Sequence, residues 1–510
     1  MEIDFKPHHD IDAKVRALLH DTFHLTALYP YQELAIRTIL ESAGLYGEKA
    51  SESAPEHQLV VLPTGSGKSI CFMLPSLLLE GITLVVYPLL ALMTDQARRM
   101  EDMGFETVLF KGSQSDAERV ISWEKLNRGL AKFVITNPET LRSPSVLERL
   151  SSFRISLAVI DEVHTITQWG ETFRPAYLDV PNALKTLHPA QIVAFTATAS
   201  PRIVERIREI LFSGKQFHLI EGNPDRPNII YRAVPSLCKI HDLSMLLQES
   251  SLLPSLVFCA TRKRSERIAW ELTRRLNNHA VRYYHAGLDT QERSLLEQWF
   301  FQSEHGILCS TNAYGMGVDK KNIRSVIHYD LSSDVESFLQ ESGRAGRDGM
   351  PACSIVLVDP YSTSTDESRQ SLEQIWQQRA DCRRQSLLKL MGYVLESCSG
   401  CDVCSNTVMR NPSGKKEILR LLYIPLRYHE DEMAALLTGD KNSIGYRSWM
   451  KIHPLFGTLA GWESEDVIKA IKTMVAATMI RKRKRFPYKD NLYLPLSILR
   501  TQLLEEFHLR

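Results

Sequence analysis

Short apolar runs alternate with amphipathic stretches through most of the chain. Up to about residue 212 the apolar runs are QLVVLP, TLVVYP, KFVIT, LAVID and IVAFTAT, and residues 91–100 and 201–211 have the spacing of helices. Continuous apolar runs separated by helices are typical of parallel strands that are buried on both faces. The pattern therefore predicts a first α/β domain over residues 1–213.

A second series of apolar runs has the same character. It comprises SLVFCA, VRYYHA, GILCST, SVIHYD and CSIVLVD, with a helical pattern over residues 264–276. We therefore expect a second parallel-sheet domain over residues 214–359, joined to the first by turn-forming sequence at residues 222–227. Two such domains in tandem predict a cleft between them.

The last part of the chain is patterned differently. After polar sequence at residues 361–366, a helical pattern leads into a group of cysteines, and we assign residues 360–409 to a small third unit. Residues 410–510 have helical patterns followed by strand, turn and strand in MIRKRKRF, PYKDN and LYLPL. That order suits a winged helix.

Composition fits a folded protein of several domains. The 510 residues are 44% hydrophobic, and 61 Lys and Arg nearly balance 60 Asp and Glu, so attraction to nucleic acid must come from local patches. The N-terminus lacks the pattern of a secretory signal, and no apolar run reaches the ~20 residues of a membrane helix. Nine cysteines, an odd number, do not suit a disulfide framework. We expect a cytoplasmic protein without membrane contact, nucleoid-associated if bacterial.

The first chemical signal is the sequence LPTGSGKS, which follows a predicted strand and precedes a predicted helix. In that order, backbone N–H groups of a glycine-rich loop wrap phosphates, and the start of the helix adds positive potential. We expect the lysine to reach the outer phosphates and the final serine to hold Mg²⁺, although Leu62 stands where the strict pattern has glycine. The predicted ligand is ATP, bound by Thr64, Gly65, Ser66, Gly67, Lys68 and Ser69.

The second signal is DEVH, which ends the apolar strand SLAVI at the sheet edge where open α/β folds bind ligands. We expect Asp161 to share Mg²⁺ with Ser69, and Glu162 to orient or deprotonate a water that attacks the γ-phosphate. An acidic strand end by itself is usually a turn or a helix cap. The upstream phosphate loop makes the catalytic interpretation the better one.

The third signal is QESGRAGRDG in the second domain, with arginines at 344 and 347. A guanidinium from the opposite domain can stabilise charge that develops on the transferred phosphate. Arg344 and Arg347 are therefore predicted catalytic groups. The alternative is a solvated basic turn that caps a helix.

These motifs together resemble superfamily 2 helicases, and within them the RecQ family of DNA helicases. Further segments in the family's order are TLVVYPLLALMTDQ, VITNPETL, AFTATAS, LVFCATR, YYHAGLDTQER and CSTNAYGMGVDKKNIRSVIHYDL. The resemblance implies two RecA-like domains, a zinc-binding domain and a winged helix, without the family's common extra C-terminal domain. It implies ATP- and Mg²⁺-dependent movement 3′ to 5′ on single-stranded DNA and unwinding of tailed duplexes in repair, recombination or genome defence.

Two other interpretations stay open from the sequence. One is a DNA-binding sensor or scaffold that uses nucleotide as a switch, and the other is a translocase, on DNA or RNA, that does not separate strands. The sequence indicates no particular protein partner.

The resemblance also assigns residues to the DNA strand and the cleft. The segment ITQWGETFRPAY resembles an aromatic-rich loop that senses single-stranded DNA, with Trp169, Phe173 and Arg174 at its key positions. Trp169 and Phe173 could instead be core aromatics. Residues 196–198 are expected to couple the ATP site to the domain interface. The residues expected to line the cleft or contact the strand are Thr311, Gly315, Gly317, Asp319 and His285.

The segment that resembles the family's adenine-recognition motif is imperfect. LLHDTFHLTALYPYQ keeps Gln32 but has His24, Leu28 and Tyr29 where glycine, phenylalanine and a basic residue are usual. Gln32 offers the paired donor and acceptor that the edge of adenine requires. We hypothesise that Tyr29 stacks on the base in place of a guanidinium.

Four cysteines have the spacing of a metal site. Fifteen residues separate the first from the second, and the last three follow one another in two overlapping CxxC steps. Four thiolates suit one tetrahedral Zn²⁺, and a full protein ligand set leaves no open position, so the metal is expected to be structural. Reduced cysteines without metal are the alternative. The predicted ligands are Cys382, Cys398, Cys401 and Cys404.

Basic and aromatic residues alternate near the end of the chain. The run before Phe486 and Tyr488 can neutralise phosphates, and an aromatic at the hairpin tip can wedge a base pair. A solvated charge run is the alternative. Trp449 and Trp462 are expected to pack in the core. The predicted DNA-binding residues of this run are Arg481, Lys482, Arg483, Lys484 and Arg485.

Overall fold

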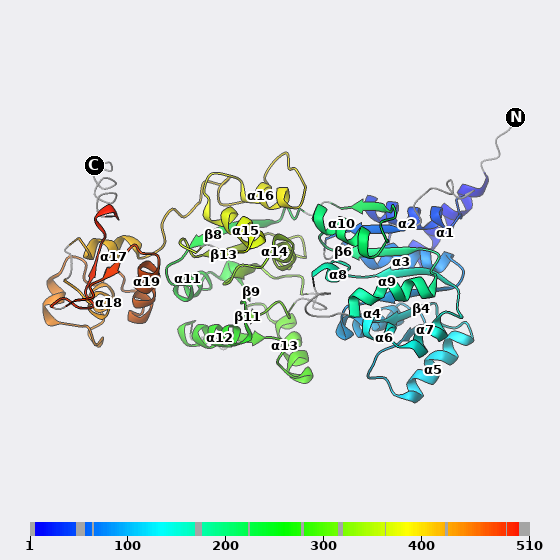
Figure 1. Ribbon diagram of the computed structural model, residues 1–510, viewed down its shortest axis with the longest axis horizontal. Coiled ribbons are helices and arrows are strands. Elements are labelled where there is room, and N and C mark those ends of the chain that lie inside the picture. The colour runs from blue at the N-terminus through cyan, green and yellow to red at the C-terminus, as the bar shows by residue number, and fades with distance from the viewer. Residues whose placement is uncertain are drawn as a thin grey trace. The chain divides into compact units, whose positions relative to one another are not determined.

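The computed structural model describes residues 6–46, 57–63, 66–168, 176–222, 225–276, 280–314, 320–362, 364–423, 427–485 and 487–498 (Figure 1). The chain divides into two compact units. The first comprises Met1–Arg226 with Gly315–Val318 and Leu390–Tyr393, and the second comprises Pro227–Tyr314, Asp319–Lys389 and Val394–Arg510. Each unit is described by itself below.

The first unit is built on a parallel sheet of seven strands in the order β3-β4-β2-β5-β6-β1-β7. Alternate residues of each strand enter cores on opposite faces: Leu59 and Val61 belong to one core, and Val60 belongs to the other. This two-sided burial explains the continuous apolar runs. The strands are β1 Gln58–Val61, β2 Ile82–Val86, β3 Thr107–Leu109, β4 Phe133–Thr136, β5 Ile155–Ile160, β6 Ile192–Thr196 and β7 His218–Glu221.

Helices connect these strands, as the sequence pattern predicts. They are α1 Lys6–Asp21, α2 Pro30–Ser42, α3 Lys68–Leu78, α4 Leu90–Asp102, α5 Asp116–Asn127, α6 Pro138–Leu141, α7 Pro144–Leu150, α8 His164–Gln168, α9 Ala176–Leu187 and α10 Pro201–Ile210. Strand β7 pairs with β1, so the first sheet continues past the boundary that we expected at residue 213.

The second unit holds a parallel sheet of six strands in the order β10-β11-β9-β12-β13-β8. The predicted α/β class is thus confirmed for both sheets. The strands are β8 Ile229–Pro235, β9 Ser255–Phe258, β10 Val281–Tyr284, β11 Ile307–Ser310, β12 Ser325–His328 and β13 Ala352–Val358. The helices are α11 Lys239–Leu246, α12 Arg262–Leu276, α13 Thr290–Gln302, α14 Val335–Ser342, α15 Glu367–Gln377 and α16 Arg383–Leu390.

The C-terminal part of the second unit has helices followed by a short antiparallel hairpin, the order that suits a winged helix. Its elements are α17 Lys415–Leu421, α18 Glu430–Thr438, the 3₁₀ helix η2 Ser448–Ile452, α19 Ser464–Ala476, β14 Arg481–Lys482 and β15 Leu492–Tyr493. Its buried residues form one hydrophobic core with residues of α11, α12 and the second sheet. Over the described ranges, no helix is long and apolar enough to cross a membrane.

Candidate functional site

Three neighbouring strands of the first sheet bring the predicted ATP-binding segments together. Strand β1 pairs with β6, and β6 pairs with β5, all in parallel. The phosphate loop follows β1, the acidic pair follows β5, and Thr196 ends β6. Because the carboxyl ends of parallel strands share one edge of a sheet, these three segments lie beside one another.

Lys68 stands at the start of α3, directly after Gly67, whose φ of 75° lies in the left-handed region. The Lys68 ammonium nitrogen is 3.6 Å from Glu162 Oε1, and the two side chains are 15% and 18% exposed. Within the described part of the chain, that nitrogen has no hydrogen-bond partner. A largely buried ammonium at the N-terminus of a helix fits a phosphate ligand. Ser66 and Ser69 flank this position, while Thr64 and Gly65 lie outside the described residues.

The acidic pair has an unusual backbone. Glu162 is a non-glycine residue with φ of 48°, and its N–H donates to Asp161 Oδ1 over 2.9 Å. Burial raises the pKa of Asp161 to about 6, with the Lys68 ammonium opposing the rise and Glu162 adding to it. A carboxylate that is desolvated in this way gains from a bound divalent cation, so Asp161 fits the predicted Mg²⁺ site.

A chain of contacts joins the acidic pair to the end of β6. His164 Nδ1 lies 3.4 Å from Glu162 Oε2 and 2.9 Å from Thr196 Oγ1. The Thr196 hydroxyl in turn donates to the carbonyl oxygen of Thr198 over 2.9 Å. Thr196 and Thr198 are thus linked to Glu162 through His164, and their expected coupling of the ATP site to the domain interface stays a prediction.

Gln32 joins α2 to the phosphate loop. Its Oε1 accepts from the Tyr29 backbone N–H over 2.9 Å, and its Nε2 donates to the Ser66 carbonyl oxygen over 2.9 Å. A Cβ at Gly67 would lie 2.6 Å from Gln32 Nε2, so a larger residue there would have to displace the Gln32 amide. The Tyr29 side chain is 62% exposed and its ring stacks on Tyr31 at 5.4 Å. It is therefore open to a ligand on its exposed side.

Arg344 and Arg347 lie just after α14, in the second unit. Arg344 is buried. Burial raises the pKa of Tyr314, and the positive charges of Arg344 and Arg347 oppose that rise. Gly346 between them has φ of 55°, and Asn228 Nδ2 donates to its carbonyl oxygen over 2.8 Å. The turn is thus held by the residue that precedes β8.

Two of the remaining predicted contact residues, His285 and Thr311, lie within the described part of the chain. His285 is described, and it is buried, with Nε2 2.8 Å from Glu266 Oε1 and Nδ1 accepting from the Gly287 N–H over 3.2 Å. Both of its ring nitrogens are thus engaged within the protein. Thr311 is buried at the end of β11. The predicted residues outside the description are Trp169, Phe173, Arg174, Gly315, Gly317 and Asp319.

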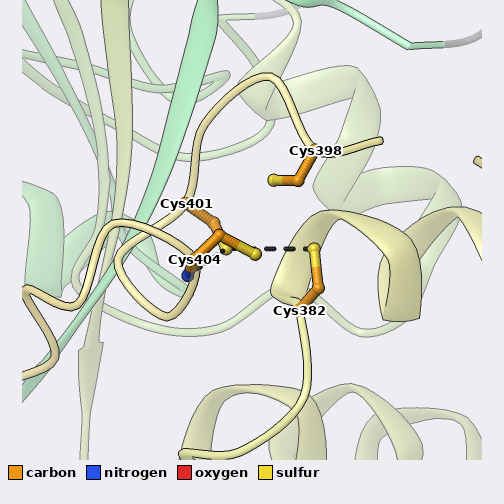
Figure 2. A group of neighbouring side chains, drawn as sticks. All are labelled: Cys382, Cys398, Cys401 and Cys404. Atoms are coloured by element: carbon orange, nitrogen blue, oxygen red, sulfur yellow. Dashed lines mark hydrogen bonds between the residues drawn. The ribbon is translucent and has the colours of Figure 1, made fainter. Parts of the chain in front are cut away.

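The four predicted zinc ligands come together. Their sulfur atoms all lie within 4.8 Å of one another, and Figure 2 shows Cys382 at the start of α16 facing the other three from the following loop. Four thiolates at 2.3 Å from a tetrahedral Zn²⁺ stand about 3.8 Å apart, and the sulfurs of Cys401 and Cys382 are 3.9 Å apart. Burial opposes ionisation of Cys401, but the Cys404 and Arg383 backbone N–H groups favour the thiolate, and its pKa falls to about 7. The donor set fits a structural zinc.

Buried charges fix the cysteine loop to the edge of the second sheet. Arg383 is 1% exposed and donates to Asp402 Oδ1 over 2.5 Å, while Asp402 Oδ2 accepts from the Ala233 N–H over 2.9 Å. The loop also bridges β8 through Tyr231 and Cys401. The cysteine spacing does not predict the structural roles of Arg383 and Asp402, because in the sequence they look like ordinary charged residues beside the cysteines.

The hairpin carries the predicted basic run, of which Lys482 is paired with Glu430 Oε2 at 2.7 Å. The other four basic residues of the run are exposed. Phe486 lies outside the described residues, and Tyr488 near the tip is 51% exposed. Trp462 is buried as expected, but the expectation for Trp449 is wrong, since it is 39% exposed on η2.

Comparisons with known proteins agree with this arrangement. The DEAD/DEAH box helicase model matches residues 29–207, and the helicase conserved C-terminal domain model matches residues 238–349. The probable ATP-dependent DNA helicase RecS of Bacillus subtilis is 36% identical over 366 residues, which cover 71% of this chain and 70% of that protein. The ATP-dependent DNA helicase RecQ of Pasteurella multocida is 32% identical over 422 residues, 79% of this chain and 64% of that protein.

A solved structure of the DUF1998 helicase MrfA bound to DNA has a TM-score of 0.56 at 18% identity, and it covers 94% of this chain and 58% of that chain. This likeness concerns the fold alone. Two parallel-sheet domains, a phosphate loop after β1 and a DEVH sequence after β5 define an ATP-dependent helicase of superfamily 2. The relatives identify the family more closely. The chain belongs to the RecQ family, and it is an ATP-dependent DNA helicase.

Proposed function

We propose that the protein hydrolyses ATP to move 3′ to 5′ along single-stranded DNA and to unwind tailed duplex DNA. The observation that carries the proposal is the Lys68 ammonium, which faces Glu162 at 3.6 Å beside the ends of β1, β5 and β6. The direction rests on the resemblance to the RecQ family. Repair, recombination and genome defence are the settings that such a reaction serves, in the cytoplasm and at the nucleoid if the source is bacterial.

In the proposed reaction, Lys68 binds the outer phosphate oxygens and moves away from Glu162 as it does so. The freed Glu162 carboxylate then orients the attacking water and accepts its proton. Ser69 and Asp161 would hold Mg²⁺, which neutralises charge on the phosphates. Gln32 would release the Ser66 carbonyl oxygen and present its amide to adenine, with Tyr29 stacked on the base.

The second unit would supply the charge that completes hydrolysis. Arg344 and Arg347 are proposed to stabilise the transferred phosphate, with Gly317 and Asp319 also contributing to nucleotide binding. Domain closure on ATP and reopening after hydrolysis would then advance the DNA strand. The aromatic loop with Trp169, Phe173 and Arg174, together with the basic run at 481–485, would hold that strand.

The test compares Lys68→Ala and Glu162→Gln with the surface control Lys125→Ala. Lys125 pairs with Glu106 on an exposed face of the first unit, at 2.8 Å. We expect each active-site variant to lose at least roughly a hundredfold in DNA-stimulated hydrolysis while it still binds DNA, because a group that acts on the transition state is lost. The control should keep wild-type rates. Full ATPase activity in either active-site variant contradicts the assignment.

The direction and the alternatives are tested with labelled duplexes that bear a 3′ or a 5′ tail, made of DNA or RNA. Unwinding of the 3′-tailed DNA alone, and only with ATP, supports the proposal. Hydrolysis and movement without strand separation would support the translocase. Nucleotide-dependent DNA binding without turnover would support a sensor or scaffold.

A further inference from the structure

Helix α19 is fixed to the second sheet domain by its own polar side chains. Asp466 is fully buried and accepts two hydrogen bonds from Arg275 of α12, over 2.5 Å from Nη1 and 2.7 Å from Nη2. Thr473, two turns further along, donates to the carbonyl oxygen of Leu237 over 3.0 Å. One side of α19 therefore faces α11 and α12.

The other contacts of α19 complete its enclosure. Trp462, just before the helix, stacks on His241 of α11 with ring centres 3.9 Å apart. A second side of α19 packs in the core that it shares with α18, through Val467, Ala470, Ile471 and Met474. The exposed positions that remain are Glu465, Lys472 and Ala476, and the Lys469 side chain is 42% exposed. These contacts hold α19 against α11, α12 and α18.

An aromatic and cationic cluster lies on another part of the same domain. The Arg427 guanidinium carbon lies 5.4 Å from the ring centre of Tyr428 and 5.5 Å from that of Trp449, and the two rings are 6.1 Å apart. The Tyr428 carbonyl oxygen accepts from the Leu492 N–H over 3.0 Å. The cluster therefore adjoins strand β15 of the basic hairpin.

Two exposed apolar side chains lie near Trp449 in the sequence. Ile452 at the end of η2 is 88% exposed, and Ile444, four residues before η2, is 92% exposed. Arg427 and Lys451 are also exposed, and among the described residues neither is found in an ion pair. A ligand that offers both flat apolar faces and negative charge matches such a surface, and a nucleic-acid strand has both.

We propose that Trp449 and Arg427 form a platform for an unpaired base of the DNA strand next to the hairpin. The indole would stack on the base while Arg427 and Lys451 approach the neighbouring phosphates. This inference rests on the proposed function, since it specifies how the same DNA is held.

The first experiment measures binding of the full chain to a 3′-tailed duplex by fluorescence anisotropy, with normal bases or abasic sites in the tail. Trp449→Ala should weaken binding to the normal tail by roughly 5- to 100-fold, the usual range for loss of one stacked base, and much less on the abasic tail. Trp449→Phe should recover most of the affinity, because it keeps an aromatic face. Equal affinities for wild type and Trp449→Ala, or equal losses on both tails, would overturn the proposal.

The second experiment uses a matched pair of charge reversals in one domain. Arg427→Glu should weaken binding and lower its salt dependence, whereas Lys472→Glu on α19 should leave both affinity and DNA-stimulated hydrolysis unchanged. An equal or larger loss in Lys472→Glu would overturn the proposal. Absence of DNA-stimulated hydrolysis in the wild type would count against the proposed function instead, so the two failures are distinguishable.

Discussion

Replacement of Asp466 by alanine should undock the C-terminal helices from the second sheet domain. The change leaves Arg275 without its bidentate partner, although its side chain is only 6% exposed. Breaking a buried ion pair from one side costs about 3–5 kcal/mol, because a charge stays buried without compensation. Glu463 and Glu271 still face Arg275 at 3.3 and 3.8 Å, so we expect the lower end of that range.

The assay is hydrogen exchange of the α19 amides, which reports the free energy of local opening. A loss of about 3 kcal/mol raises their exchange rate on the order of 100-fold. Arg274→Ala is the matched control one residue away, since its pair with Glu463 has side chains 48% and 37% exposed. Such a pair contributes at most about 1 kcal/mol.

The double variant Arg275→Leu, Asp466→Leu tests the physical reason. Replacing both charges with apolar side chains removes the uncompensated charge, so α19 should recover much of its protection. If Asp466→Ala exchanges no faster than Arg274→Ala, or if the double variant is worse than Asp466→Ala, the ion pair does not hold the domain.

Three further predictions concern metal and pH. Cys398→Ser, or a strong chelator, should remove one zinc per chain by metal analysis and open the segment around residues 382–404 to protease, whereas Cys71→Ser should do neither; full protease resistance of a zinc-free chain would contradict it. Because the pKa of Asp161 is about 6, protons compete with Mg²⁺ below that pH, and the Mg²⁺ needed for half-maximal hydrolysis should rise roughly tenfold per pH unit there; an unchanged requirement between pH 5.5 and 7.5 would contradict it. Burial lowers the pKa of His241 from 6.5, so the unfolded state binds more protons than the folded state. Protection of the α19 amides from hydrogen exchange should therefore fall as the pH drops below 6.5. His241→Phe should lose this pH dependence, and a pH dependence that persists in the variant excludes His241 as its source.

Most strands of both sheets could be predicted because their residues are buried on both faces, which gives continuous apolar runs in the sequence. The pattern missed β3, β7 and β8. β7 is a short edge strand with the sequence HLIE, in which Ile220 is the one buried residue. The phosphate loop, the acidic pair and the cysteines were predictable because their chemistry requires fixed residue types at fixed spacing.

Residues that act through distant partners could not be predicted in this way. Asp466 and Arg275 are 191 positions apart in the chain, and each looks like an ordinary surface residue of an amphipathic helix. Trp449 was assigned to the core because tryptophan is usually buried, but it lies on a short 3₁₀ turn where only part of its ring finds neighbours.

The shared hydrophobic core of the second sheet and the C-terminal helices has a practical consequence for dissecting the protein. A fragment that ends near residue 410 would leave Leu237, Ile240 and Leu243 uncovered, and it should aggregate. The turn between the two strands of the hairpin can therefore be shortened or replaced. Grafting the whole C-terminal segment onto another helicase would require transplanting α11 and α12 with it.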